Sequence, residues 1–83
     1  MVSLLSVSKA QDKLRQNVKN IRLSQSLTQA GLANRAGVPL PTLRKFEQKG
    51  LISLEAFLKI LMVLGSLDTL VDTPQNDQEH LYP

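Results

Sequence analysis

The sequence predicts a small all-α domain, and composition, length and apolar periodicity each favour that class. Among 83 residues, sixteen are leucine and only three are aromatic. Leucine, alanine, lysine and glutamine favour helices, whereas the β-branched and aromatic residues that favour strands are scarce beside them. A chain of this length buries one core and not two. Its 42% of apolar and 20% of charged residues exclude a disordered chain.

Apolar periodicity and start and stop residues predict five helices, of which two precede the centre of the chain. The first begins at about Ser8, whose spacing from Gln11 fits a capping box, and ends near residue 25. The second begins at Thr28, a good N-cap residue, and extends to about residue 36. Gly37 follows it and suits a left-handed turn position.

Prolines determine where the third helix begins. Pro41 restricts Leu40 to extended conformations, so Leu40 is the expected N-cap and Pro41 lies in the first turn, where proline is tolerated. The helix then continues to residue 48 or 49. Gly50 is its expected stop.

Two more helices are predicted over 53–64 and about 67–71, capped by Ser53 and Ser66. The helix over 53–64 is apolar around most of its circumference and is therefore buried on more than one side. One core in so short a chain covers only part of it, so the rest should face a second subunit or another protein. The expected plan is an N-terminal extension (1–7), a folded domain (8–71) and a flexible C-terminal tail (72–83).

Several classes of function have no support in the sequence. Cysteine is absent, which excludes disulfides, cysteine metal sites and thiol nucleophiles and makes a cytoplasmic setting the default expectation. The lone histidine, His80, argues against a metal site or a nucleophile–base pair. No signal peptide, membrane span or glycine-rich phosphate loop is recognisable. We therefore expect no enzyme activity, no cofactor and no metal.

The formal charge of +3 conceals two opposed halves. Residues 9–49 contain nine basic and two acidic side chains, a net charge of +7, whereas residues 50–83 have a net charge of −4. A basic half on a small domain suggests an anionic partner. The alternative is a set of solvated helix faces that happen to be basic.

The stretch 29–46 fits two short helices joined at Gly37. A small residue, Ala33, is needed where two helices cross steeply in a tight turn, and glycine suits the positive φ four residues later. This is the helix-turn-helix pattern, although an αα-hairpin can share its spacing by chance. The side chains expected to hold the two helices together are Leu32, Ala36, Val38, Leu43 and Phe46.

These residues resemble the Cro-like (XRE) helix-turn-helix family of phage repressors and bacterial regulators over about residues 14–71. The resemblance is carried by Arg22, Thr28-Gln29, Leu32-Ala33, Ala36-Gly37-Val38, Thr42-Leu43, Phe46-Glu47 and Gly50. It implies a five-helix, phage-repressor-like domain that binds double-stranded DNA as a homodimer and represses transcription. The continuation from Phe46 to Leu70 is similar to the HipB-like antitoxin branch, which implies a HipA-type kinase toxin as a further partner.

The resemblance also implies which residues contact DNA. Gln29 would hold a phosphate at the start of the second helix, and the third helix would enter the major groove. Leu40 and Pro41 depart from the family, which often has polar residues there, and Gly31 stands where a capping-box glutamate is common. Apolar residues at two reading positions shift sequence preference toward DNA shape and the neighbouring cations. The implied DNA-binding set is Thr28, Gln29, Leu40, Pro41, Thr42, Arg44, Lys45, Gln48 and Lys49.

Two further expectations concern structure and assembly. Arg22 and Glu47 occupy positions that the family pairs, and we favour a partly buried ion pair over the alternative that Arg22 binds DNA. A protein–protein adaptor that keeps the fold without binding DNA is the rival function, and the apolar Leu40 and Pro41 are its best support. The expected dimer contacts are Leu61, Leu64, Leu67, Leu70 and Val71.

Overall fold

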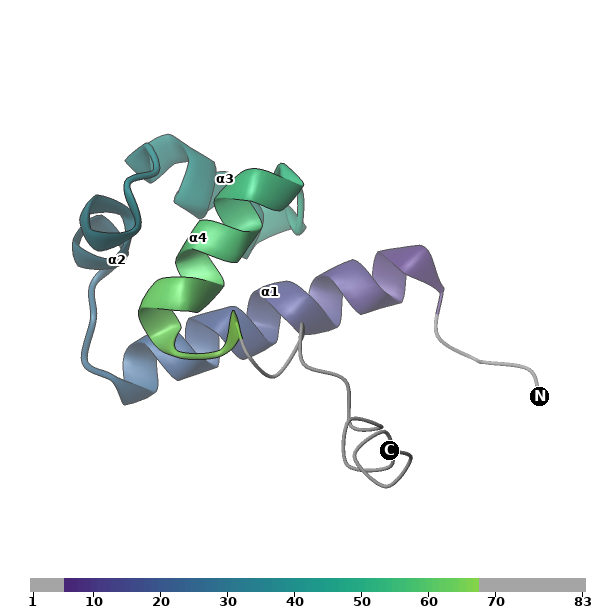
Figure 1. Cartoon of the computed structure of the whole chain (residues 1–83). Coiled ribbons are helices and arrows are strands. Elements are labelled where there is room, and N and C mark those ends of the chain that lie inside the picture. Colours follow the sequence, from purple (N-terminus) through teal and green to yellow (C-terminus); the bar gives the residue numbers. More distant parts are fainter. Residues whose placement is uncertain (1–5, 68–83) are drawn as a thin grey trace, which may run out of the picture.

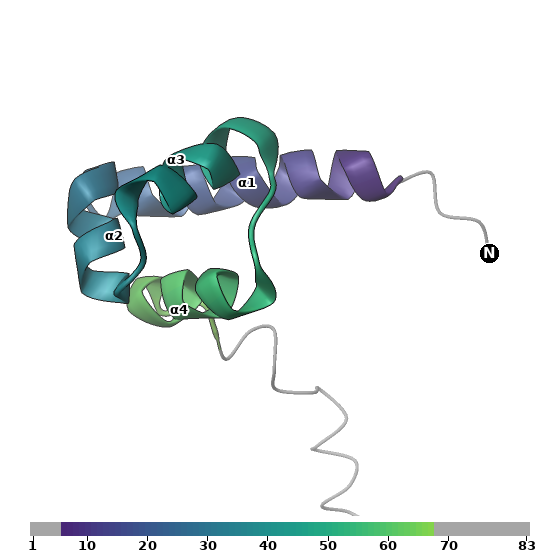
Figure 2. The same ribbon diagram turned by 90° about the horizontal axis from the view of Figure 1, so that it is seen from above.

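A computed structural model describes residues 6–67 and contains four helices in that range. These are α1 (Val7–Ser24), α2 (Gln29–Ala36), α3 (Leu40–Lys49) and α4 (Leu54–Leu64). The shorter helices α2, α3 and α4 gather beside the C-terminal half of α1, and the start of α1 projects beyond them (Figure 1). Seen from above, α3 and α4 lie on opposite sides of the domain (Figure 2). Among the described residues, no helix is long and apolar enough to cross a membrane.

Helix α1 begins two residues earlier than the sequence suggested. Ser6, not Ser8, is the N-cap, and its Oγ accepts a hydrogen bond from the Lys9 N–H at 3.1 Å. The earlier start adds a backbone hydrogen bond from the Ala10 N–H to the Ser6 carbonyl, 2.9 Å long. Both serines are suitable N-cap residues, so the two additional residues of helix and their backbone hydrogen bond favour the first of them.

Helices α2 and α4 begin where the sequence predicted. The Thr28 Oγ1 accepts from the Gly31 N–H at 2.9 Å, and the Ser53 Oγ accepts from the Ala56 N–H at 3.1 Å. The expected glycines, Gly37 and Gly65, end the two helices in the left-handed region. Each helix therefore has a side-chain cap at its start and glycine at its end.

Helix α3 begins one residue earlier than expected, because Pro39 and not Leu40 is its N-cap. The Pro39 carbonyl accepts from the N–H groups of Thr42 and Leu43, at 3.0 and 3.3 Å. Pro41 lies within the first turn and has no N–H, so its position there leaves no donor unsatisfied. This start needs no side-chain cap.

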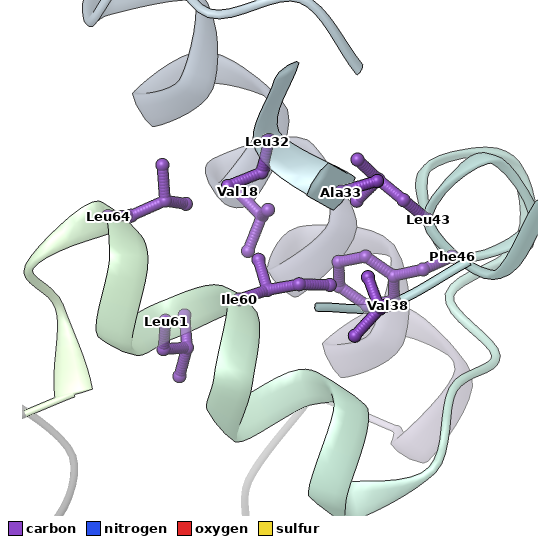
Figure 3. Close-up of a cluster of buried hydrophobic side chains, with 9 residues drawn as sticks. All are labelled: Val18, Leu32, Ala33, Val38, Leu43, Phe46, Ile60, Leu61 and Leu64. Carbon is purple, nitrogen blue, oxygen red and sulfur yellow. The ribbon is translucent and has the colours of Figure 1, made fainter. Parts of the chain in front are cut away.

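The core lies where α2, α3 and α4 meet α1. Phe46, Leu32, Leu43 and Ile60 are fully buried, and the Phe46 ring packs at 5.5 Å and 59° against that of Phe57. The motif residues expected inside are buried, except that Ala36 is only partly so. The nine buried apolar residues, shown in Figure 3, are Val18, Leu32, Ala33, Val38, Leu43, Phe46, Ile60, Leu61 and Leu64.

The apolar side chains of α1 at positions 14, 18 and 21 reach the core only in part. Val18 is buried and Ile21 packs against the core, but Leu14 is 41% exposed. Leu14 lies at the edge of an apolar hollow of about 310 Å³ between α1 and α4, to which Phe57 and Leu61 also contribute. The expected fifth helix lies, apart from Leu67, outside the described residues, as do the tail and most of the N-terminal extension.

Gly50, which ends α3 at φ +73°, also permits a close approach between the end of α3 and α1. A Cβ atom at Gly50 would lie 3.0 Å from both the Cβ and the carbonyl oxygen of Gln11. Gly37 has a similar φ of +70°, but nothing lies within 4 Å of the corresponding point. Conformation alone thus favours glycine at position 37, whereas conformation and space both favour it at position 50.

Candidate nucleic-acid interface

The turn between α2 and α3 has a fixed geometry. Gly37 adopts φ +70°, and the Val38 N–H then donates to the Ala33 carbonyl at 3.0 Å. Ala33 and Val38 are 2% and 8% exposed, so the turn is anchored in the core on both sides. The relative orientation of α2 and α3 is therefore determined by packing rather than by a flexible hinge.

Helix α3 has an apolar inner face and a polar outer face. Leu43, Phe46 and Glu47 are buried, whereas Pro41, Arg44, Lys45, Gln48 and Lys49 are exposed and Thr42 is partly exposed. None of the three exposed cations forms an ion pair with any residue from 6 to 67. The outer face of α3 thus presents one amide and three cations that have no ion-pair partner in the described part of the chain.

The two apolar positions at the start of α3 lie differently. Leu40 is partly buried and packs against the core, whereas Pro41 is exposed. Of these two residues, Pro41 is therefore the one with the larger exposed fraction. Leu40 contributes to the packing of the domain itself.

The start of α2 has free backbone donors. The first helical backbone bond is from the Leu32 N–H to the Thr28 carbonyl, and the Thr28 hydroxyl accepts from the Gly31 N–H. The N–H groups of Gln29 and Ala30 precede these bonds and point out of the helix end. A helix N-terminus with free N–H groups favours an anion such as phosphate.

The Gln29 side chain does not extend freely into solvent. Its Nε2 donates to the Glu47 Oε1 at 3.0 Å, which joins the start of α2 to the buried face of α3. An amide nitrogen has two hydrogens, so one of them is still free to donate elsewhere. Sequence reasoning placed Gln29 at the surface and missed this contact.

Arg22 and Glu47 form a two-point ion pair inside the domain. The Arg22 Nε and Nη2 donate to the two Glu47 carboxylate oxygens at 2.8 and 2.9 Å. The Arg22 Nη1 donates to the Leu27 carbonyl at 2.8 Å, and the two residues are only 6% and 5% exposed. With its donors engaged in this way, Arg22 connects α1, the turn before α2, and α3.

Two further side chains bridge distant elements in ways that sequence reasoning missed. The Arg15 Nη1 donates to the Glu47 carbonyl at 3.1 Å, close to the end of α3, while its Nε pairs with Asp12 at 3.0 Å. The Gln25 Nε2 donates to the Leu64 carbonyl at 2.9 Å, at the end of α4. The Asp12–Arg15 spacing was visible in the sequence, but nothing there indicated the long-range acceptors.

The residues expected at a dimer contact do not form one surface in the described region. Leu61 and Leu64 are 4% and 5% exposed and belong to the core, so they stabilise the monomer and leave little area for a second chain. Leu67 is partly buried against the same core, and Leu70 and Val71 lie outside the described residues. Residues 6–67 also hold no cluster of three acidic or histidine side chains that could bind a metal.

Comparison with known proteins agrees with this geometry. A family model described as helix-turn-helix matches residues 18–70, which is more than half of the chain. The match begins in the middle of α1 and includes α2, α3, α4 and the Arg22–Glu47 pair. No curated protein matches the chain.

Proposed function

Since the chain belongs to the XRE-type helix-turn-helix family, which is one of DNA-binding regulators, we propose that it represses transcription by placing α3 in the major groove of a specific operator. The observation that carries the proposal is the outer face of α3. It is exposed and cationic, and it lies opposite a face that is locked into the core. A helix held in this way presents its side chains to the base edges in one orientation.

The exposed side chains divide into two proposed roles. Arg44 and Lys45 would donate to the O6 and N7 of guanine, and Pro41 and the Thr42 methyl would contact thymine methyl groups. Gln48 and Lys49 would contact phosphates near the end of α3. Because Leu40 packs against the core, direct base contacts are few, and sequence-dependent DNA shape would supply part of the specificity.

A phosphate would lie at the start of α2. The free N–H groups of Gln29 and Ala30 and the positive end of the helix dipole favour it there, and Thr28 shapes the helix end by capping. The second amide hydrogen of Gln29 would donate to the same phosphate. This contact would determine the register of α3 along the groove without reading sequence.

The proposed regulator acts as a homodimer on a pseudo-palindromic operator, with the two copies of α3 about 34 Å apart, one turn of DNA. It occludes a promoter in the cytoplasm and performs no chemistry. Autoregulation as an antitoxin is a narrower candidate, favoured by the net charge of −4 over residues 50–83, which suits a basic partner such as a HipA-type kinase toxin. Co-purification with a kinase-fold protein would separate this role from plain repression.

The decisive experiment begins with selection of bound sites from random duplexes. The best duplex is then titrated with wild-type protein at several salt concentrations. We expect steeply salt-dependent binding that weakens further for Lys45→Ala. The matched control is Lys9→Ala, an exposed lysine at the projecting start of α1. Absence of binding to any duplex at low salt would favour the adaptor function instead.

A further inference from the structure

Helix α4 has a second apolar face that no described residue covers. Its inner face, with Ile60, is in the core, whereas Leu54 and Met62 on the outer face are 71% and 65% exposed. Leu58 lies between them and is partly exposed. Residues four apart in a helix lie nearly above one another, so Leu54, Leu58 and Met62 form one stripe along the length of α4.

The stripe extends at its start toward α1. Leu51, just before α4, is 45% exposed. Leu54 also lines an apolar hollow of about 200 Å³ together with Leu14, Ile52 and Phe57. The uncovered apolar surface is thus wider than one row of side chains near the start of α4.

One flank of the stripe is charged. Glu55 and Lys59 are 79% and 47% exposed and pair with each other at 3.1 Å. On a helix of 3.6 residues per turn, Glu55 and Lys59 both lie beside the stripe, on the same side of it. Helix α4, which lies wholly within the described residues, has no other charged side chain.

From this pattern we infer that the outer face of α4 docks against α4 of a second copy of the chain. The two helices are antiparallel and related by a two-fold axis at Leu58. That arrangement places Leu54 of each copy against Met62 of the other, and Leu58 against itself. An isologous contact requires a self-complementary surface, and the symmetric spacing of the stripe about Leu58 satisfies this requirement.

The charges favour the same arrangement. In an antiparallel pair, the same flanks of the two helices face each other. Glu55 of one copy then lies about two residues, or roughly 3 Å along the axis, from the level of Lys59 of the other. A lysine side chain spans such an offset easily. Two equivalent Glu55–Lys59 contacts therefore accompany the apolar stripe, and a parallel pairing would lose them.

The size of the contact sets its strength. One pair of short helices buries less than the roughly 1,200 Å² of a typical stable interface, so self-association is weak in solution and is reinforced when both copies bind one duplex. The inference rests on the proposed function only in that a two-fold operator requires a dimer. Its test contains no DNA, so it can fail or succeed independently of DNA binding.

The test uses the full chain and two charge variants. Glu55→Lys places two lysines on the flank, and Lys59→Glu places two glutamates there. We expect each variant alone to self-associate about tenfold more weakly than wild type, and an equimolar mixture to recover the loss as a heterodimer. Sedimentation equilibrium, or native mass spectrometry of chains with different tags, measures this. Recovery should diminish as salt is raised.

A second pair of variants tests the apolar stripe. Met62→Glu should weaken self-association by more than about tenfold, because each dimer buries two copies of the side chain. Leu23→Glu is the matched control, since Leu23 is an apolar side chain that is 54% exposed on α1. Circular dichroism and thermal unfolding establish that all four variants are folded.

Three results would overturn the inference. One is a mixture of charge variants that associates no better than its components. Another is a Met62→Glu chain that associates as strongly as wild type. The third is a wild-type chain that stays monomeric at millimolar concentration. In that last case peroxide oxidation of Met62, with free methionine as reference, reports whether the chain's own residues cover the face (slow oxidation) or leave it open for an unrelated partner (rapid oxidation).

Discussion

The Glu47 carboxylate accepts two hydrogen bonds from Arg22, from Nε at 2.8 Å and from Nη2 at 2.9 Å, and both side chains are almost wholly buried. Charges buried in this way stabilise only as a pair, since removal of one partner leaves the other without compensation. Gln29 and Arg15 add contacts to Glu47 from α2 and α1. Helix α3 is therefore held on its inner side by polar contacts as well as by Leu43 and Phe46.

We expect Arg22→Ala to lower the free energy of unfolding by about 3–5 kcal/mol, because it leaves the Glu47 carboxylate buried and unpaired. Chemical denaturation measures the change. Arg35→Ala, at an exposed position in α2, is the control and should change stability little. Unchanged stability with lost DNA affinity would mean that Arg22 acts on DNA instead. The double variant Arg22→Met with Glu47→Met should recover much of the loss.

Gly50→Ala should destabilise the domain more than Gly37→Ala. Both substitutions place a side chain at positive φ, which costs about 1–3 kcal/mol. Only at Gly50 does the new Cβ also meet Gln11, at 3.0 Å from its backbone oxygen. Urea unfolding midpoints of the two variants give the comparison directly. Equal losses of stability would show that α1 and α3 can move apart near position 50 without a cost in folding free energy.

The start of α1 can be tested with its two serines. Ser6→Ala should lower stability by about 0.5–1 kcal/mol, because the Lys9 N–H loses its acceptor. Ser8→Ala should have almost no effect, since Ser8 is exposed and inside the first turn. Helix content by circular dichroism, together with thermal melts, distinguishes the two. A larger loss of stability for Ser8→Ala than for Ser6→Ala would mean that Ser8 is the N-cap, as the sequence predicted.

The two proposed classes of DNA contact differ in their salt dependence and specificity. Lys49→Ala should weaken binding to all duplexes by a similar factor and reduce the salt slope by about one. Arg44→Ala should cost about 1–3 kcal/mol against the best site and relax the preference at one base pair. Binding isotherms on the selected site and on single-base variants give both quantities. If Arg44→Ala weakens binding to every duplex by the same factor, Arg44 contacts a phosphate and not a base.

Local chemistry made the helices predictable. Thr28 and Ser53 are N-caps in the structure, as the sequence predicted. The interaction is local, because the cap hydroxyl accepts a hydrogen bond from the N–H only three residues later in the chain. The starts of α1 and α3 were less predictable. For α1, both Ser6 and Ser8 are residues that can cap a helix, and Ser6 is the one that does so. For α3, Pro41 lies one residue further into the helix than expected.

The surfaces of α4 were harder to predict. A helix that is apolar nearly all round does not reveal which side meets the core, so Leu61 and Leu64 were expected at a dimer contact and instead lie in the core. The contacts of Arg15 and Gln25 join residues 32 and 39 positions apart, and no spacing in the chain encodes them. Such contacts follow from the way helices pack and not from their individual sequences.

The division of α3 into two faces has a consequence for the evolution of this protein. The side chains that hold the helix, Leu43, Phe46 and Glu47, are distinct from the exposed ones at positions 41, 44, 45 and 48. Exposed helix positions accept most residues at a cost within about 0.5 kcal/mol. If α3 reads the operator as proposed, copies of this gene can diverge in operator preference one exposed residue at a time while the domain stays folded. The same separation makes the helix a convenient place to rewrite specificity by design.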